Sequence, residues 1–96
     1  MAVYDTNFVK TKEGNGIKSG ETLKITIDGA THVSGGIYKD NLPIQAGFEF
    51  NDTIEFKLAK RVYHEGQWKT AGYATGKYTL KIRTPGQGWD DEFLIF

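Results

Sequence analysis

Hydrophobic and polar residues alternate along several short segments of this chain, the pattern of β-strands that bury one face. The segment 21–28 shows it most cleanly, and segments 44–50 and 78–84 repeat it. Because side chains of a strand point alternately to its two faces, each segment has one face that we expect to be buried. The expected inward residues are Leu23, Ile25 and Ile27, then Ile44, Ala46, Phe48 and Phe50, then Tyr78, Leu80 and Ile82.

Weaker patterns appear toward both ends of the chain. Residues 3–10 predict a less regular strand, and residues 92–96 predict a last strand that ends with the chain. Glycines at 14–16 and at 35–36 predict loops. The acidic run 89–92 predicts a solvated loop before the last strand, with charges that discourage pairing at a sheet edge.

Segment 53–63 fits two structures. A helix would begin at Asp52 or Thr53 but would leave Phe56 on the wet face. A strand places Ile54, Phe56, Leu58 and Val62 on one side and leaves only Lys60 out of pattern. The pattern therefore favours a strand, followed by a hairpin loop at 64–67 and a further strand over 68–74.

Seven or eight short strands with frequent turn residues predict an all-β fold in a single domain over residues 1–96. The expected architecture is an antiparallel β-sandwich, immunoglobulin-like or jelly-roll-like, with a small barrel as the alternative. The segment 76–82, Gly-Lys-Tyr-Thr-Leu-Lys-Ile, resembles the tyrosine corner of immunoglobulin-like and fibronectin-type domains. This resemblance concerns the fold and implies no function.

Composition excludes several classes of chemistry. The chain has 96 residues and no cysteine, so disulfides, thiol nucleophiles and cysteine-ligated metals are excluded. Neither His32 nor His64 lies in a recognisable catalytic or metal-binding motif. We therefore expect a non-enzymatic protein without a cofactor or metal. The first residues show no secretory signal and no apolar run is long enough to span a membrane, which favours the cytoplasm or an assembled particle.

Charge is unevenly distributed along a chain whose net charge is zero. Residues 56–83 carry seven basic residues and one acidic residue, whereas both flanking segments are acidic. Tyrosine and tryptophan flank the 64–67 hairpin, and such residues often anchor protein interfaces. We expect a protein–protein interaction module, an inhibitor, adaptor or assembly subunit, that binds an acidic protein surface. The candidate partner-binding residues are Lys57, Arg61, Tyr63, Trp68, Tyr73, Lys81 and Arg83.

Two other functions stay open. A carbohydrate-binding module would stack sugars on Trp68, Tyr73 and Trp89 and would hydrogen-bond them through Asp90 and Asp91. Binding of single-stranded nucleic acid on a small barrel is less favoured, because phosphate binding usually needs a basic domain. The apolar end of the chain must be paired within the domain or in a homo-oligomer, since an exposed strand of this kind aggregates.

Overall fold

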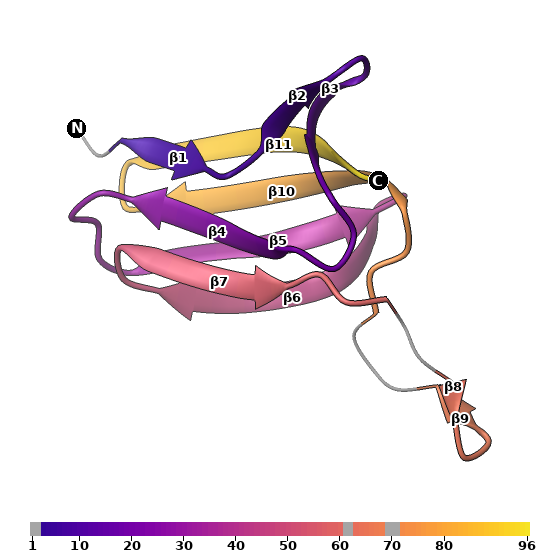
Figure 1. Ribbon diagram of the computed structural model, residues 1–96. Helices are drawn as coiled ribbons and strands as arrows, with labels where there is room; N and C mark the ends of the chain where they lie inside the picture. The colour runs from indigo at the N-terminus through magenta and orange to yellow at the C-terminus, as the bar shows by residue number, and fades with distance from the viewer. Residues whose placement is uncertain (1–2, 61–62, 69–71) are drawn as a thin grey trace.

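Two β-sheets packed face to face form the body of the protein (Figure 1). The computed structural model describes residues 3–60, 63–68 and 72–96, and these contain strands, turns and irregular segments but no helix. The all-β sandwich is confirmed, and the barrel alternative is wrong. The strands are β1 (Tyr4–Thr6), β2 (Val9–Thr11), β3 (Gly14–Ile17), β4 (Thr22–Ile27), β5 (Val33–Lys39), β6 (Leu42–Phe50), β7 (Thr53–Lys57), β8 (Tyr63–His64), β9 (Gln67–Trp68), β10 (Gly76–Thr84) and β11 (Gln87–Ile95).

The smaller sheet has the antiparallel order β1-β4-β7. Its central strand buries the three side chains expected from the alternation, Leu23, Ile25 and Ile27. The strand predicted for 53–63 is confirmed only over β7, since residues 58–60 are irregular and residues 61–62 lie outside the described part. The strand ends where Leu58 turns into the core: its N–H donates to Glu21 O, and its carbonyl accepts from Gly20 N, both at 2.9 Å.

The larger sheet has the order β2-β3-β11-β10-β5-β6. Strands β10 and β11 pair along their whole length, from Gly76 opposite Ile95 to Thr84 opposite Gln87. The predicted inward face of β10 is buried, as are Phe93 and Ile95 of β11. The acidic run 89–92 lies within β11, so its prediction as a loop is wrong. The end of the chain is therefore paired inside the domain and needs no second copy for that purpose.

The segment 3–10 forms two strands, one in each sheet, instead of one strand. Between them the Asn7 side chain bridges to β4: its Oδ1 accepts from Lys24 N at 2.9 Å, and its Nδ2 donates to Thr22 O at 2.7 Å. The next side chain, Phe8, stacks on Phe93 with ring centroids 4.8 Å apart. The glycines at 14–16 belong to β3, which pairs with β2 and runs parallel to β11. Their prediction as a loop is wrong.

Gly35 and Gly36 also lie inside a strand, β5, and not in a loop. A Cβ atom on Gly35 would stand 2.6 Å from Lys81 O and 2.8 Å from the Phe48 ring. Glycine is therefore required here for close packing, and not for a turn. The neighbouring β6 follows the predicted alternation only in part, because Ala46 is exposed while Phe48 is buried. Register shifts between β5 and β6 interrupt the two-residue period there.

Tyr78 stands near the start of β10, the second-last strand, and its hydroxyl donates to Ala74 O at 2.7 Å. The hydroxyl thus bonds back to the backbone four residues upstream, which is the kind of contact that a tyrosine corner makes. Upstream, β8 and β9 form a hairpin that lies outside the sandwich (Figure 1). Its two-residue turn, Glu65–Gly66, has φ of 52° and 78°. His64 and Gln67 thus belong to strands, and the strand predicted for 68–74 is absent over 72–74.

Candidate interaction surface

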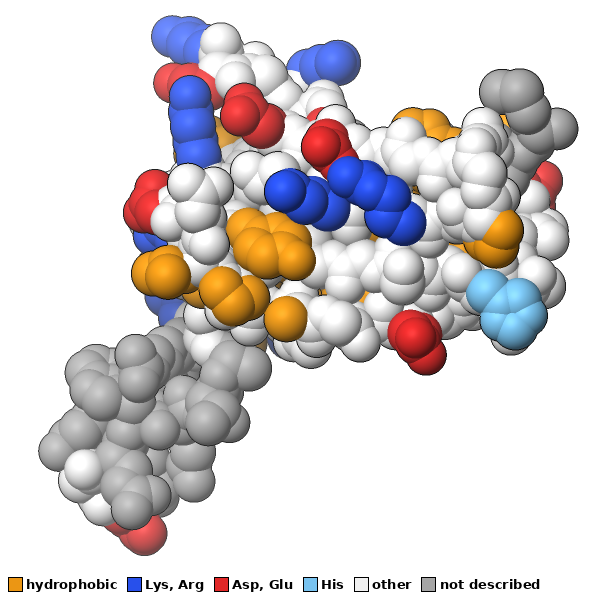
Figure 2. All heavy atoms as spheres, turned by 180° about the vertical axis from the view of Figure 1, so that it is seen from behind, with side chains coloured by type: hydrophobic (Ala, Val, Ile, Leu, Met, Phe, Trp, Pro, Cys, Tyr) orange, Lys and Arg blue, Asp and Glu red, His pale blue; other side chains and the backbone are white. Residues whose placement is uncertain are grey.

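The outer face of the larger sheet brings two of the predicted residues together with an aromatic side chain. Lys81 and Arg83 of β10 point away from the core, and the register places them opposite Gly36 and Ser34 of β5. Tyr38 follows on the same face. Figure 2, which views this side of the molecule, shows Lys and Arg side chains beside hydrophobic ones. These residues surround a shallow hollow of about 290 Å³, lined by Ser34, Gly35, Gly36, Tyr38, Gly47, Lys81 and Arg83. We call it the β5–β10 hollow.

Tyr38 forms one wall of the β5–β10 hollow. A Cβ on Gly36 would lie 2.8 Å from the Tyr38 ring, so the missing side chain leaves the space in which the ring lies. The Lys81 ammonium stands over the same ring, 5.4 Å from its centroid. An exposed contact of this kind is a cation–π interaction, which holds the ring and the cation next to each other.

Arg83 closes the other side of the hollow and is held in place by three acceptors. Its Nη1 forms an ion pair with Asp90 Oδ1 at 2.7 Å and donates to Ile82 O and Trp89 O at 2.9 and 3.2 Å. Its side chain lies across Gly88, where a Cβ would stand 2.9 Å from Arg83 Cδ. The hydrogen bond from Arg83, with the nearby charges of Arg83 and Lys81, lowers the pKa of Asp90. Asp90 thus remains ionised at neutral pH.

Apolar side chains adjoin the β5–β10 hollow on the edge strand β6. Pro43 and Ala46 are both exposed. Pro43 lies directly opposite Tyr38 in the β5–β6 register. The outer face of the larger sheet therefore joins an apolar area to a basic one, as protein interfaces with an apolar centre and a polar rim do.

Of the other predicted partner-binding residues, Lys57 and Tyr73 are not part of this surface. Lys57 is exposed on β7 of the smaller sheet and therefore lies on the opposite outer face of the sandwich. Tyr73 is only 3% exposed and packs against Tyr78, so its prediction as a surface anchor is wrong. Arg61 lies outside the described residues. Tyr63 and Trp68 face each other in the β8–β9 register, but their side chains are not among those described.

Trp89 and Asp91 lie on the core-facing side of β11, where both are partly buried. The Trp89 ring stacks on Tyr4, with centroids 5.4 Å apart and planes inclined by 17°. The Tyr4 hydroxyl donates to Asp91 Oδ2 at 2.9 Å, and Asn15 Nδ2 donates to Asp91 Oδ1 at 3.3 Å. Trp89 therefore closes one side of the core. The ring face that stacks on Tyr4 is not available for stacking on a sugar.

We expect the Tyr4–Asp91 contact to make the protein sensitive to alkaline pH. Burial, and then the hydrogen bond to Asp91, raise the pKa of Tyr4 far above its usual value. A raised pKa means that the stability from this contact is complete below the unfolded-state pKa of about 10 and is lost as pH rises toward the folded-state pKa. Denaturant unfolding between about pH 8 and about pH 11 should show a smaller loss of stability in Tyr4→Phe than in the wild type. An equal loss in both would contradict this role for Tyr4.

Two further hollows lie at opposite ends of the sandwich. One, of about 380 Å³, is lined by His32, Ser34, Glu49, Phe50 and Asn51. The His32 N–H donates to Asn51 Oδ1 at 3.0 Å, which fixes this loop. No group of three or more His, Asp or Glu residues in the described part of the chain is placed to hold a metal. The His64 side chain lies outside that part.

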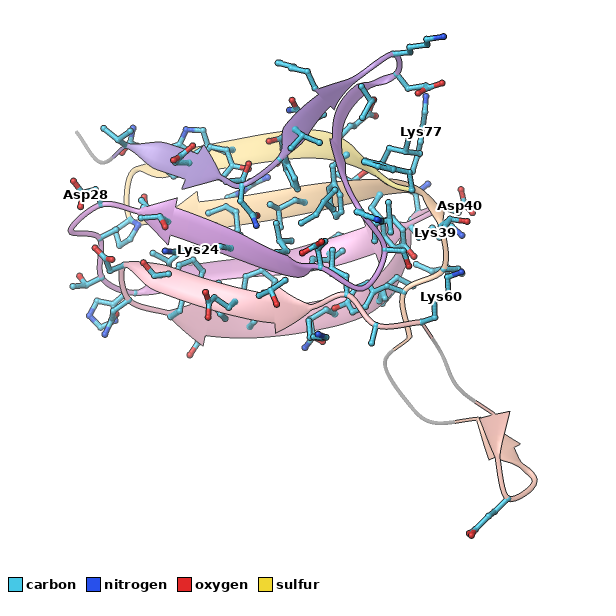
Figure 3. All side chains as sticks on the ribbon, viewed as in Figure 1. Lys24, Asp28, Lys39, Asp40, Lys60 and Lys77 are labelled. Atoms are coloured by element: carbon cyan, nitrogen blue, oxygen red, sulfur yellow. The ribbon has the colours of Figure 1, made fainter. Side chains whose placement is uncertain are left out.

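The second end hollow, of about 390 Å³, lies near the base of the β8–β9 hairpin and is lined by residues that include Lys39, Lys60 and Tyr78. Figure 3 shows Lys39, Asp40, Lys60 and Lys77 at this end of the sandwich, far from Lys24 and Asp28. The Lys39 ammonium lies 5.6 Å from the Tyr78 ring centroid and donates to Thr75 O at 3.4 Å. Lys39 lies outside the basic segment 56–83, so the charge profile of the sequence did not group it with Lys60 and Lys77.

Comparisons of the chain with protein-family models, with curated proteins and with solved structures found no match. Among the described residues, no helix has the length and apolar character needed to cross a membrane.

Proposed function

We propose that this protein is a non-enzymatic binding module that recognises an acidic surface of a partner protein through the β5–β10 hollow and the apolar residues beside it. The observation that supports this most directly is the position of Tyr38, Lys81 and Arg83. All three lie on the outer face of the sheet, where they add nothing to the core. Aromatic and arginine side chains of this kind are enriched at the centres of protein interfaces.

We further propose that the sandwich is of the immunoglobulin-like type. Strands β4 and β7 lie in one sheet, while the hairpins β5–β6 and β10–β11 lie together in the other. This matches the division of strands between the two sheets of immunoglobulin-like domains, and the tyrosine corner on the second-last strand supports it. A jelly roll would distribute eight strands over two sheets in two Greek keys, which agrees less well with a β1-β4-β7 sheet.

The charges around the hollow support an acidic partner. Lys81 and Arg83 flank it, and the carboxylate of Asp90 beside it is already bound to Arg83. Positive potential on such a face speeds encounter with an acidic surface and disfavours basic ones. The apolar side chains of Pro43 and Ala46 would then contribute area buried on binding.

A photo-crosslinking experiment tests this surface. A photoreactive phenylalanine analogue replaces Tyr38 in one preparation and Thr26, on the opposite sheet, in another; both are exposed to lysate and irradiated. We expect a protein adduct at position 38 that is absent at position 26. Lys81→Glu should reduce this adduct about tenfold, because repulsion replaces attraction at the contact.

The matched control is Lys57→Glu, the same charge reversal on the outer face of the smaller sheet. It should leave the adduct at position 38 unchanged. If Lys57→Glu removes the adduct and Lys81→Glu does not, the proposed contact of Lys81 with the partner is wrong. If neither position yields an adduct, the proposed function is wrong for both faces.

A further inference from the structure

The two walls of the β5–β10 hollow differ in chemistry, and this difference limits the kind of group that the hollow can bind. Its floor is the glycine backbone of β5 and β6, one wall is the Tyr38 ring, and the opposite wall is Arg83. Its volume of about 290 Å³ lies at the lower end of the range for ligand pockets, which is suited to one side chain or a small fragment. A flat ring inserted there would pack against Tyr38, since aromatic rings favour offset or edge-to-face contact.

Asp90 occupies the position beside the hollow that an incoming carboxylate would take. It lies on β11 and reaches Arg83 Nη1 at 2.7 Å, with both side chains at least half exposed. An exposed ion pair of this kind contributes little to folding, so it can be exchanged for an equivalent contact. The other two acceptors of Arg83 Nη1 are backbone carbonyls, which keep the guanidinium in place during such an exchange.

Resting on the proposed function, we propose that the β5–β10 hollow is an anchor pocket for an aromatic side chain of the partner, and that a carboxylate next to this side chain replaces Asp90 on Arg83. Tyr38 and the glycine floor select the ring, while Lys81 and Arg83 select the acid. Asp90 competes with the partner's carboxylate for Arg83. A partner segment that has an aromatic ring but no neighbouring acid cannot replace Asp90 there, and its affinity is therefore too low for binding.

The experiment uses the full chain labelled with ¹⁵N and the capped tripeptide Glu-Phe-Glu as a probe, followed by amide chemical shifts. We expect saturable shifts at Ser34, Gly36, Tyr38 and Lys81. The tripeptide Glu-Ala-Glu should bind at least about tenfold more weakly, because it lacks the ring. Lys-Phe-Lys should cause no shifts at these positions. Shifts absent from the hollow, or equal for Glu-Phe-Glu and Glu-Ala-Glu, would overturn the anchor pocket.

The competitor role is tested by Asp90→Asn, which keeps the shape of the side chain and removes its charge. This variant should raise the affinity for Glu-Phe-Glu about fivefold, which is the effect expected of one screened charge about 4 Å away. The affinity for Gln-Phe-Gln, which carries no carboxylate, should stay unchanged. The matched control is Glu55→Gln on the opposite outer face, which should change neither. Equal effects of the two variants would overturn the role of Asp90. These outcomes are independent of the crosslinking result, which tests whether a partner protein binds at all.

Discussion

Removal of residues 92–96 is expected to abolish the cooperative folding of this protein. These residues form the end of β11, which lies between β10 and β3 in the larger sheet. Phe93 and Ile95 are almost fully buried, and Phe93 stacks on both Phe8 and Tyr78. Loss of a buried phenylalanine costs about 3–5 kcal/mol and of a buried isoleucine about 2–5 kcal/mol. Together these two losses approach the free energy of unfolding of a whole domain, which is about 5–15 kcal/mol.

The truncation also removes backbone hydrogen bonds that fix the chain before β4. Phe96 N donates to Ile17 O at 3.1 Å, and Phe96 O accepts from Ser19 N at 2.6 Å. Thermal unfolding followed by circular dichroism should show no cooperative transition in the truncated chain. Phe96→Ala provides the control: its side chain is 47% exposed, so this variant should still unfold cooperatively. A truncated chain with a sharp transition would show that the end of β11 is peripheral.

The strands that could be predicted are those whose burial follows the two-residue period without interruption. In β4 and β10 every second side chain enters the core, so the local pattern contains the necessary information. In β6 the period is broken by register shifts that depend on β5, a different part of the chain. The segment 3–10 crosses from one sheet to the other at Asn7, and its partners lie on β4. Such long-range contacts have no local signature.

The residues of the candidate site also divide into those that could be predicted from the sequence and those that could not. Sequence alternation correctly placed Lys81 and Arg83 on an outward face, because β10 is regular. It could not separate them from Lys57, because assigning strands to one sheet or the other depends on strand order. Tyr38 was not singled out, because the adjoining Gly35 and Gly36 predicted a loop where the structure has a strand. A glycine pair between hydrophobic residues can indicate close packing in a strand, which is the signal that would have identified β5.

Gly35→Ala is expected to lower the free energy of unfolding by about 1–3 kcal/mol, the usual effect of overpacking. Glycine to alanine normally stabilises a compatible position by about 0.4–1 kcal/mol, because the unfolded chain loses entropy. At Gly35 the added Cβ would stand 2.6 Å from the backbone oxygen of Lys81, which is fixed by strand pairing. The β5 backbone must therefore move away from β10, and this cost exceeds the gain.

Gly36→Ala separates this steric effect from a general need for glycine in β5. Its added Cβ would contact the outer atoms of the Tyr38 ring at 2.8 Å, and an outward-facing ring can rotate away. Urea unfolding should therefore show a clear decrease in stability for Gly35→Ala and a change of less than about 1 kcal/mol for Gly36→Ala. Equal decreases would mean that both glycines are needed for backbone conformation. Because Gly36→Ala moves Tyr38 without unfolding the sheet, it would also show how far the β5–β10 hollow depends on the position of that ring.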